Sequence, residues 1–286
     1  MSLLADGVRG FLVDMDGTLY LSDRLLPGAR EFWEFTQGAG LPVLFLSNNS
    51  SKNRAAYAHK INTLGIPVTI EHIFTSGEAT ALYLQRIAPP SAPVAVFGTP
   101  DLEQTFAAAG FALTLERPDY VVLGFDTTID YAKLTRLCDL VRAGLPYLAT
   151  HPDFNCPVAG GVIPDIGAII AFVEASTGRR PDVIIGKPNR HILDMAAARL
   201  GVPVEALCMI GDRLYTDIAM GQNAPIHTAL VLSGETRRAD LAHSPYQPDY
   251  IFENLAELTA HLRAEYLGLE NRRAEVITPP RGDVSP

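Results

Sequence analysis

The chain has 286 residues, of which 48% are hydrophobic, and this is enough to build a full core and predicts two domains. Its 23 basic and 32 acidic residues give a net charge of −9, and no run rich in lysine and arginine concentrates positive potential. Nucleic acid is therefore not expected as a partner. A small anionic substrate could still bind where a cation or backbone N–H groups reverse the local field.

The three cysteines, Cys138, Cys156 and Cys208, are scattered and form no Cys-x-x-Cys pair, which is typical of a reducing compartment. No apolar run approaches the roughly 18 residues of a membrane span, and the N-terminus lacks a signal-peptide pattern. The sequence thus predicts a soluble cytoplasmic protein with no membrane partner.

The first apolar run, residues 11–13, predicts a strand that leads directly into Asp14-Met15-Asp16-Gly17-Thr18. Ligands of open α/β sheets bind at the carboxyl ends of strands, and side chains two apart on a strand face the same side. Asp14 and Asp16 can therefore share one site, with one carboxylate as nucleophile or metal ligand and the other as proton donor. The alternative is an acidic strand-to-turn junction without chemistry.

The same arrangement recurs along the chain, where each predicted strand is followed by polar residues. Strands predicted at 43–46, 183–185, 206–210 and 229–232 lead into Ser47-Asn48, Gly186-Lys187, Gly211-Asp212 and Ser233-Gly234. Helices predicted at 52–64 and from about 190 to 200 are each followed by a glycine. This alternation predicts an α/β fold, a doubly wound parallel sheet whose polar loops share one edge.

A second alternation of strands and helices lies between proline-containing segments at 89–93 and 177–181. Strands are predicted at 94–97, 120–123 and 147–149, and helices near 101–109, 130–143 and 166–176. The pattern predicts a smaller α/β domain inserted into the first, in a position suited to a lid. One long continuous sheet is the alternative.

Several of these polar residues also have structural interpretations. Lys187 could be a solvated loop lysine, although its Gly-Lys-Pro setting at a strand end favours a functional role. Asp212, Asp217 and Ser47 could each cap a helix. The seven histidines show no paired ligand spacing, so a zinc site is not expected.

Four motifs occur in a fixed order, namely Asp14-x-Asp16-Gly17-Thr18, Ser47-Asn48, Lys187, and Gly211-Asp212 with Asp217. Over residues 8–260 the chain resembles haloacid dehalogenase-superfamily phosphatases, in particular the NagD-like branch of p-nitrophenyl phosphatase and phosphoglycolate phosphatase type. This branch has a large α/β cap between its second and third motifs. The resemblance implies a catalytic core at 1–79 and 185–286, a cap at 80–184, and a C-terminal tail at 262–286.

The resemblance also implies residue roles. Asp14 would attack phosphorus to form an aspartyl phosphate, and Asp16 would protonate the leaving alkoxide. Asp14, the backbone carbonyl of Asp16, and Asp212 would hold one Mg²⁺ ion. Ser47, the Asn48 amide and Lys187 would bind the phosphoryl group, while Thr18 and Asp217 orient these groups.

The loop at 151–156 follows the third predicted strand of the inserted domain, and we expect its Asp153 and Asn155 to contact the substrate's leaving group. His151 stands where the branch often has asparagine, and Pro225 stands where it usually has glycine. Both are departures from the family pattern.

The predicted function is a magnesium-dependent phosphatase acting on a small phosphomonoester, which could be a sugar phosphate, phosphoglycolate, a nucleotide or pyridoxal phosphate. Family analogy adds a homodimer through the cap. Two alternatives are other chemistry on the same scaffold, such as dehalogenation or phosphotransfer, and a non-catalytic binding protein. Asp16 argues against dehalogenation, since by family analogy dehalogenases lack an acid there.

Overall fold

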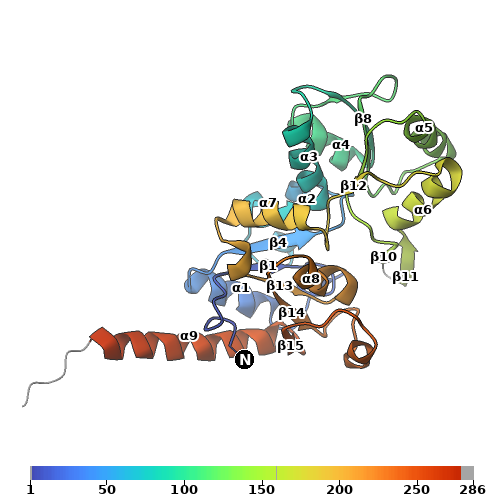
Figure 1. Ribbon diagram of the computed structural model, residues 1–286. Helices are drawn as coiled ribbons and strands as arrows, with labels where there is room; N and C mark the ends of the chain where they lie inside the picture. The colour runs from blue at the N-terminus through green and yellow to red at the C-terminus, as the bar shows by residue number, and fades with distance from the viewer. Residues whose placement is uncertain (1, 159, 278–286) are drawn as a thin grey trace, which may run out of the picture.

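The computed structural model describes residues 2–158 and 160–277, which form two α/β units, one above the other in Figure 1. The six-stranded sheet of the larger unit is entirely parallel and has the strand order β15-β14-β13-β1-β4-β5. Its strands are β1 (Gly10–Val13), β4 (Val43–Ser47), β5 (Ile73–Thr75), β13 (Leu207–Gly211), β14 (His227–Val231) and β15 (Tyr250–Phe252). The predicted parallel-sheet fold is confirmed.

Helices cover both faces of this sheet. They are α1 (Ala29–Gly38), α2 (Arg54–Thr63), α7 (Arg190–Leu200), α8 (Met220–Asn223) and α9 (Leu255–Ile277). The larger unit also has short turns of helix at Ile70–His72, Val204–Ala206, Leu214–Ile218 and Arg238–Ala242, and a small hairpin of β2 (Tyr20–Leu21) and β3 (Arg24–Leu25). On β1, Phe11 and Val13 pack with α1 and α9 residues, while Leu12 packs with those of α7 on the other face. The pleat of the strand thus explains why its apolar run is continuous.

The chain leaves the larger unit after β5 and returns after β12 (Val183–Ile184). In between, a second parallel sheet has the strand order β12-β9-β8-β6-β7. Its other elements are β6 (Pro93–Phe97), α4 (Pro100–Ala108), β7 (Ala112–Leu113), β8 (Tyr120–Leu123), α5 (Tyr131–Arg142), β9 (Tyr147–Ala149), the hairpin of β10 (Asn155–Val158) and β11 (Gly161–Pro164), and α6 (Ile166–Thr177). The sheets are separate, so the alternative of one continuous sheet is wrong.

Two elements connect the units. Strand β12 pairs with β9 in the smaller sheet, so the prediction that residues 183–185 belong to the sheet of β1 is wrong. An apolar run identifies a strand but not its neighbour, because pairing is decided by tertiary contacts. Helix α3 (Ser76–Ile87) packs on both units, with Ala79 in a core of the larger unit and Ala81 and Leu84 in a core of the smaller one.

Helix α9 replaces part of the predicted tail. Residues 262–277 continue this helix, which lies along α1 and projects beyond the larger unit (Figure 1), whereas residues 278–286 lie outside the described residues. Leu255, Leu258 and Leu262 are fully buried, and their spacing of three and four residues places them on one helix face. That face anchors the helix. No helix in the described part of the chain is long and apolar enough to cross a membrane.

Candidate active site

The predicted polar residues meet at the carboxyl ends of β1 and β13. These strands are adjacent and parallel, with Val13 opposite Ile210, so Asp14 and Asp212 emerge side by side. The Nζ of Lys187 lies 2.5 Å from Asp14 Oδ1 and 2.7 Å from Asp217 Oδ1, although Lys187 and Asp14 are 173 residues apart in the sequence. The expected convergence at one sheet edge is therefore present.

Lys187 is a buried cation shared by two carboxylates. Its side chain is only 3% exposed, so the interpretation as a solvated loop lysine is wrong. Burial by itself would lower the pKa of Lys187, but the carboxylates of Asp14 and Asp217 outweigh it and raise the pKa above its ordinary value. The lysine therefore carries a permanent positive charge beside Asp14.

Asp14, Asp212 and Asp217 offer carboxylate oxygens that all lie within 4.8 Å of one another. Burial, and then the charges of Asp14 and Asp217, raise the pKa of Asp212 to about 8. Three carboxylates with one ammonium group leave an excess of negative charge in a buried place. The cluster has the electrostatics of a site for a divalent cation.

The oxygen atoms of Asp217 are already used. One accepts a hydrogen bond from Lys187, and the other accepts the backbone N–H of Arg213 at 3.1 Å. Asp217 therefore fixes both the lysine and the loop after β13, in line with an orienting role. Asp14 and Asp212 line the cavity over this cluster and Asp217 does not, so the first two are better placed as ligands.

The residues around Asp212 fit a bound cation. Thr18 Oγ1 donates to Asp212 Oδ1 at 3.3 Å, and the backbone N–H of Glu235 donates to Oδ2 at 2.7 Å. A Cβ atom added to Gly17 or Gly234 would lie 2.4 or 2.0 Å from Asp212 Oδ2. Two glycines thus let backbone approach this carboxylate closely, and Gly17, with φ of +94°, also has a conformation that other residues rarely adopt.

Asp16 lies at the rim of the same cluster. Its pKa is raised by burial, an effect that the positive charges of Lys60 and Arg213 reduce. A raised pKa keeps the carboxyl protonated to higher pH, as a proton donor requires.

Ser47 and Asn48, at the end of β4, complete the edge. Both are buried, and three hydrogen bonds hold the Asn48 side chain. Its Nδ2 donates to the Lys187 carbonyl at 3.0 Å and to Asp153 Oδ1 at 3.1 Å, while its Oδ1 accepts the Lys187 N–H at 2.8 Å. Ser47 Oγ accepts the N–H of Asn49 at 3.1 Å. These bonds fix the loop where a phosphoryl group is expected to bind.

A cavity of about 920 Å³ opens over this cluster between the two units. The larger unit contributes Asp14, Asp16, Ser47, Asn48, Lys187 and Asp212, and the smaller unit contributes the loop and hairpin that carry Asp153, Asn155 and Asp165. Of the two predicted leaving-group contacts, Asn155 is exposed on β10, whereas Asp153 is buried and turned toward the larger unit.

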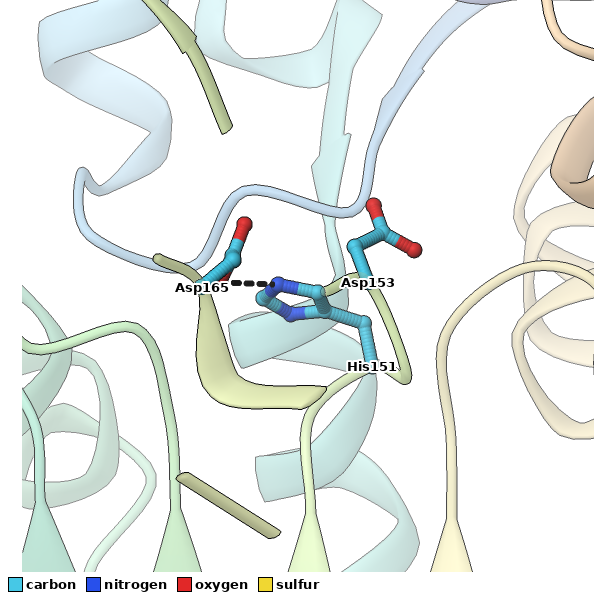
Figure 2. Close-up of side chains that lie close together, drawn as sticks. All are labelled: His151, Asp153 and Asp165. Carbon is cyan, nitrogen blue, oxygen red and sulfur yellow. Dashed lines mark hydrogen bonds and ion pairs between the residues drawn. The ribbon is translucent and has the colours of Figure 1, made fainter. Parts of the chain in front are cut away.

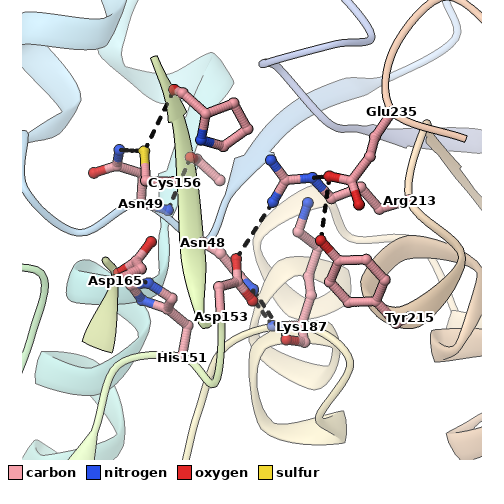
Figure 3. A network of polar contacts seen from close by, with 12 residues as sticks. Asn48, Asn49, His151, Asp153, Cys156, Asp165, Lys187, Arg213, Tyr215 and Glu235 are labelled. Carbon is pink, nitrogen blue, oxygen red and sulfur yellow. Dashed lines mark hydrogen bonds and ion pairs between the residues drawn. The ribbon is translucent and has the colours of Figure 1, made fainter. Parts of the chain in front are cut away.

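Arg213 is a cavity residue that sequence reasoning missed. Its Nη1 lies 3.6 Å from Asp153 Oδ2, and its Nε lies 3.1 Å from Glu235 Oε2, which also accepts from the Tyr215 hydroxyl at 3.2 Å. Figure 3 shows this network, which continues through Asp153 to Asn48 and so joins the two units. In the sequence, the position of Arg213 directly after Asp212 is the signal that could have identified it as a site residue.

His151 and Asp165 form a second feature that the sequence did not predict. Asp165 precedes α6, and its Oδ1 lies 2.9 Å from His151 Nε2 (Figure 2). His151 is fully buried and does not line the cavity, so the departure from asparagine at this position acts on Asp165 and not directly on a substrate. Pro225 is exposed in the short connection between α8 and β14, where its neighbours Ala224 and Ile226 are buried.

Comparison with known proteins gives the family. Residues 11–112 match a model described as haloacid dehalogenase-like hydrolase, and residues 184–258 match one described as HAD-hydrolase-like. The chain is 34% identical to the 5'-nucleotidase YutF of Bacillus subtilis over 87% of this chain and 96% of the relative. The chain belongs to the haloacid dehalogenase-like hydrolase family. The predicted family is thereby confirmed.

Solved structures of named phosphatases share the whole fold. The 4-nitrophenylphosphatase of Thermotoga maritima is 44% identical with a TM-score of 0.88, covering 92% of this chain and all of the other. A glycerol phosphate phosphatase of Mycobacterium tuberculosis, solved with calcium, is 29% identical with a TM-score of 0.82, covering 90% of this chain and 76% of the other. The predicted enzyme class, a phosphatase of this family, is confirmed, and the acidic cluster agrees with use of a divalent metal ion.

Proposed function

We propose that this protein is a magnesium-dependent phosphatase that hydrolyses small phosphomonoesters through an aspartyl phosphate. The observation that supports this most strongly is the buried group of Asp14, Asp212 and Asp217 around the single ammonium group of Lys187. Phosphoryl transfer requires an in-line nucleophile, fixed positive charge and aligned donors, and this sheet edge holds a candidate for each.

The reaction begins with Asp14, whose Oδ1 accepts a hydrogen bond from the Nζ of Lys187. The other carboxylate oxygen attacks phosphorus, so that an O–P bond forms while the bond to the leaving oxygen breaks. Protonated Asp16 gives its proton to that oxygen, and its raised pKa suits this role. Asp16 then takes a proton from water as the water attacks the acyl phosphate and regenerates Asp14.

The phosphoryl oxygens are bound by Ser47, the Asn48 amide and the Lys187 ammonium group, which is held by Asp217. Asp14, the backbone carbonyl of Asp16, and Asp212 would hold Mg²⁺, with Thr18 orienting Asp212. A bound Mg²⁺ ion would screen the negative charges of the nucleophile and the phosphoryl group from each other.

Residues 80–184 are proposed to act as a cap over this site, with Asp153 and Asn155 near the leaving group. The cavity lined by both units supports this division. A homodimer through the cap remains a proposal, and light scattering would test it. The three cysteines are free, as expected for a protein of the reducing cytoplasm.

The proposal is tested by steady-state hydrolysis of 4-nitrophenyl phosphate with Mg²⁺ and with excess chelator. Turnover is expected with Mg²⁺ and should disappear with chelator, returning when Mg²⁺ is added back. Full turnover in excess chelator would contradict the metal requirement, and no turnover with any divalent ion would favour a binding protein on the same fold.

A further inference from the structure

The two walls of the cavity differ in the charges that they carry. The larger unit contributes all of its cations, Lys52, Lys60, Lys187 and Arg213, together with the carboxylates of Asp14, Asp16, Asp212 and Glu235. The wall from the inserted unit carries the carboxylates of Asp153 and Asp165 and, among its described residues, no lysine or arginine. Such a cavity complements a molecule with an anionic phosphoryl group at one end and a neutral or cationic group at the other.

We propose that Asp165 recognises the leaving group by accepting a hydrogen bond from a hydroxyl or amine, and that it selects against leaving groups with a second negative charge. This inference rests on the proposed phosphatase function and narrows its substrate class. It favours polyol phosphates over phosphorylated acids such as phosphoglycolate.

One oxygen of Asp165 is fully used by the protein. Oδ1 accepts from His151 Nε2 at 2.9 Å and from the backbone N–H of Ile166 at 2.6 Å, where it caps α6. Among the described residues no donor reaches Oδ2, and Figure 2 shows this oxygen directed away from His151. Asp165 lines the cavity while only 4% exposed. The side chain thus presents one free acceptor from a rigid position.

A chain of hydrogen bonds behind Asp165 holds the His151 ring in place. The N–H of Phe125 can only donate, and it donates to Ser50 Oγ at 2.9 Å. Ser50 can then donate to Thr150 Oγ1 at 2.9 Å, and Thr150 to His151 Nδ1 at 3.0 Å. In this direction Nδ1 accepts and Nε2 donates to Asp165. His151 is a positioning residue that fixes the orientation of the Asp165 side chain.

Asp153 cannot serve in the same way. Its Oδ1 accepts from Asn48, and its Oδ2 pairs with Arg213 at 3.6 Å, so both oxygens are engaged by the larger unit. Asp153 therefore links the two units. Of the two carboxylates on the wall of the inserted unit, Asp165 is the one with an oxygen that accepts no hydrogen bond from the described residues.

Asp165 also lies on the leaving-group side of the site. Asp16, Cys156 and Asp165 all line the same cavity, and burial followed by the carboxylates of Asp165 and Asp16 raises the pKa of the Cys156 thiol to about 11. Asn49 Nδ2 donates to Cys156 Sγ at 3.8 Å, which places the hairpin against the loop after β4. Because Asp16 is the proposed proton donor to the leaving oxygen, a leaving group in this cavity would extend from Asp16 toward the wall that carries Asp165.

The test compares the wild-type enzyme with Asp165→Asn, which keeps a good helix cap and one oxygen but replaces the free acceptor with a donor. The probes are glycerol 3-phosphate and 2-phosphoglycolate, with 4-nitrophenyl phosphate as a leaving group that has no donor. Asp130→Asn is the matched control, since Asp130 caps α5 of the same unit, accepting from the Lys133 N–H, and does not line the cavity. Thermal unfolding checks that both variants are folded.

The wild type is expected to prefer glycerol 3-phosphate to phosphoglycolate. Asp165→Asn should reduce this kcat/KM ratio about 10- to 100-fold, the range for a hydrogen bond to a charged group, and should also lower the ratio of glycerol 3-phosphate to 4-nitrophenyl phosphate. Asp130→Asn should leave both ratios unchanged. Equal losses on all three probes, or unchanged ratios, would overturn the inference alone. No hydrolysis of any probe by the wild type would overturn the proposed function with it.

Discussion

Replacing Asp212 with asparagine should abolish activity, and the same replacement should make the metal-free protein more stable. The carboxylate lies beside Asp14 and Asp217, and its pKa is raised to about 8. Asparagine has nearly the same shape and remains neutral at every pH. It can accept the Glu235 N–H through its oxygen and donate to the Thr18 hydroxyl through its nitrogen, so both existing contacts have a replacement.

The size of the effect follows from proton linkage. When the pKa of an aspartate is higher in the folded protein than its ordinary value of 3.8, ionising the carboxyl destabilises the fold. Below about pH 4 the carboxyl is protonated in both states, so it causes no loss of stability. The loss grows as pH rises from 3.8 toward 8 and is constant above that. Each pH unit above 3.8 costs ~1.4 kcal/mol of stability, so at pH 7, about three units higher, the largest possible loss is about 4 kcal/mol. Because Lys187 and the other two carboxylates readjust, we expect a gain of about 1–4 kcal/mol for Asp212→Asn.

Urea unfolding in excess chelator at pH 5, 6, 7 and 8 measures this gain, which should increase with pH. Asp139→Asn, which removes an exposed partner of Arg142, is the control and should change the free energy of unfolding by less than about 0.5 kcal/mol. Added Mg²⁺ should stabilise the wild type and not Asp212→Asn. A variant less stable than the wild type at pH 7, or a gain that does not depend on pH, would refute the reasoning.

Four further predictions concern the proposed machinery. Asp14→Asn should lower kcat by at least about 100-fold with unchanged circular dichroism, because an amide is a poor nucleophile, and a smaller loss would contradict its assignment. The wild type should lose activity as pH rises through the raised pKa of Asp16, and Asp16→Asn should slow alkyl phosphates more than 4-nitrophenyl phosphate; equal slowing would argue against a proton donor. Lys187→Met leaves two buried carboxylates without a counter-charge and should cost about 3–5 kcal/mol in urea unfolding with chelator, so a cost near zero would disagree with the buried pairing. Asp153→Ala and Asn155→Ala should change kcat/KM unequally across a panel of phosphorylated metabolites, whereas a uniform effect would mean that the loop is structural.

The convergence of the site could be predicted because it depends on rules that are local in sequence. Each apolar run ends in polar residues, and parallel strands joined by right-handed crossovers place those ends at one edge. Asp14 and Asp212 follow β1 and β13, so the sequence predicts that both lie at this edge, and the direct pairing of the two strands then brings them side by side. The ammonium group of Lys187 reaches the same point for a different reason, because its chain crosses from β12 of the smaller sheet back to the larger unit.

What could not be predicted depends on which surfaces meet. The apolar run at 183–185 fits either sheet, and the choice of β9 as its neighbour comes from packing within the inserted unit. Leu255, Leu258 and Leu262 have helical spacing, but the segment after 261 has no strong stop signal and was expected to be a tail. Only the contact of this face with α1 shows that the helix continues as part of the fold.

His151 and Asp165 show most clearly why a local pattern cannot assign a role. An aspartate directly before an apolar helix is predicted to be an N-cap, and Asp165 is one, since it accepts the Ile166 N–H. A carboxylate has two oxygens, however, and capping uses one of them, so the sequence cannot say where the other points. That depends on His151, which is fourteen residues earlier and fixes the side chain from behind. His151, which the sequence marked only as a departure from the family pattern, thus supports the residue that faces the cavity, because β9 and α6 of the inserted unit bring the two together.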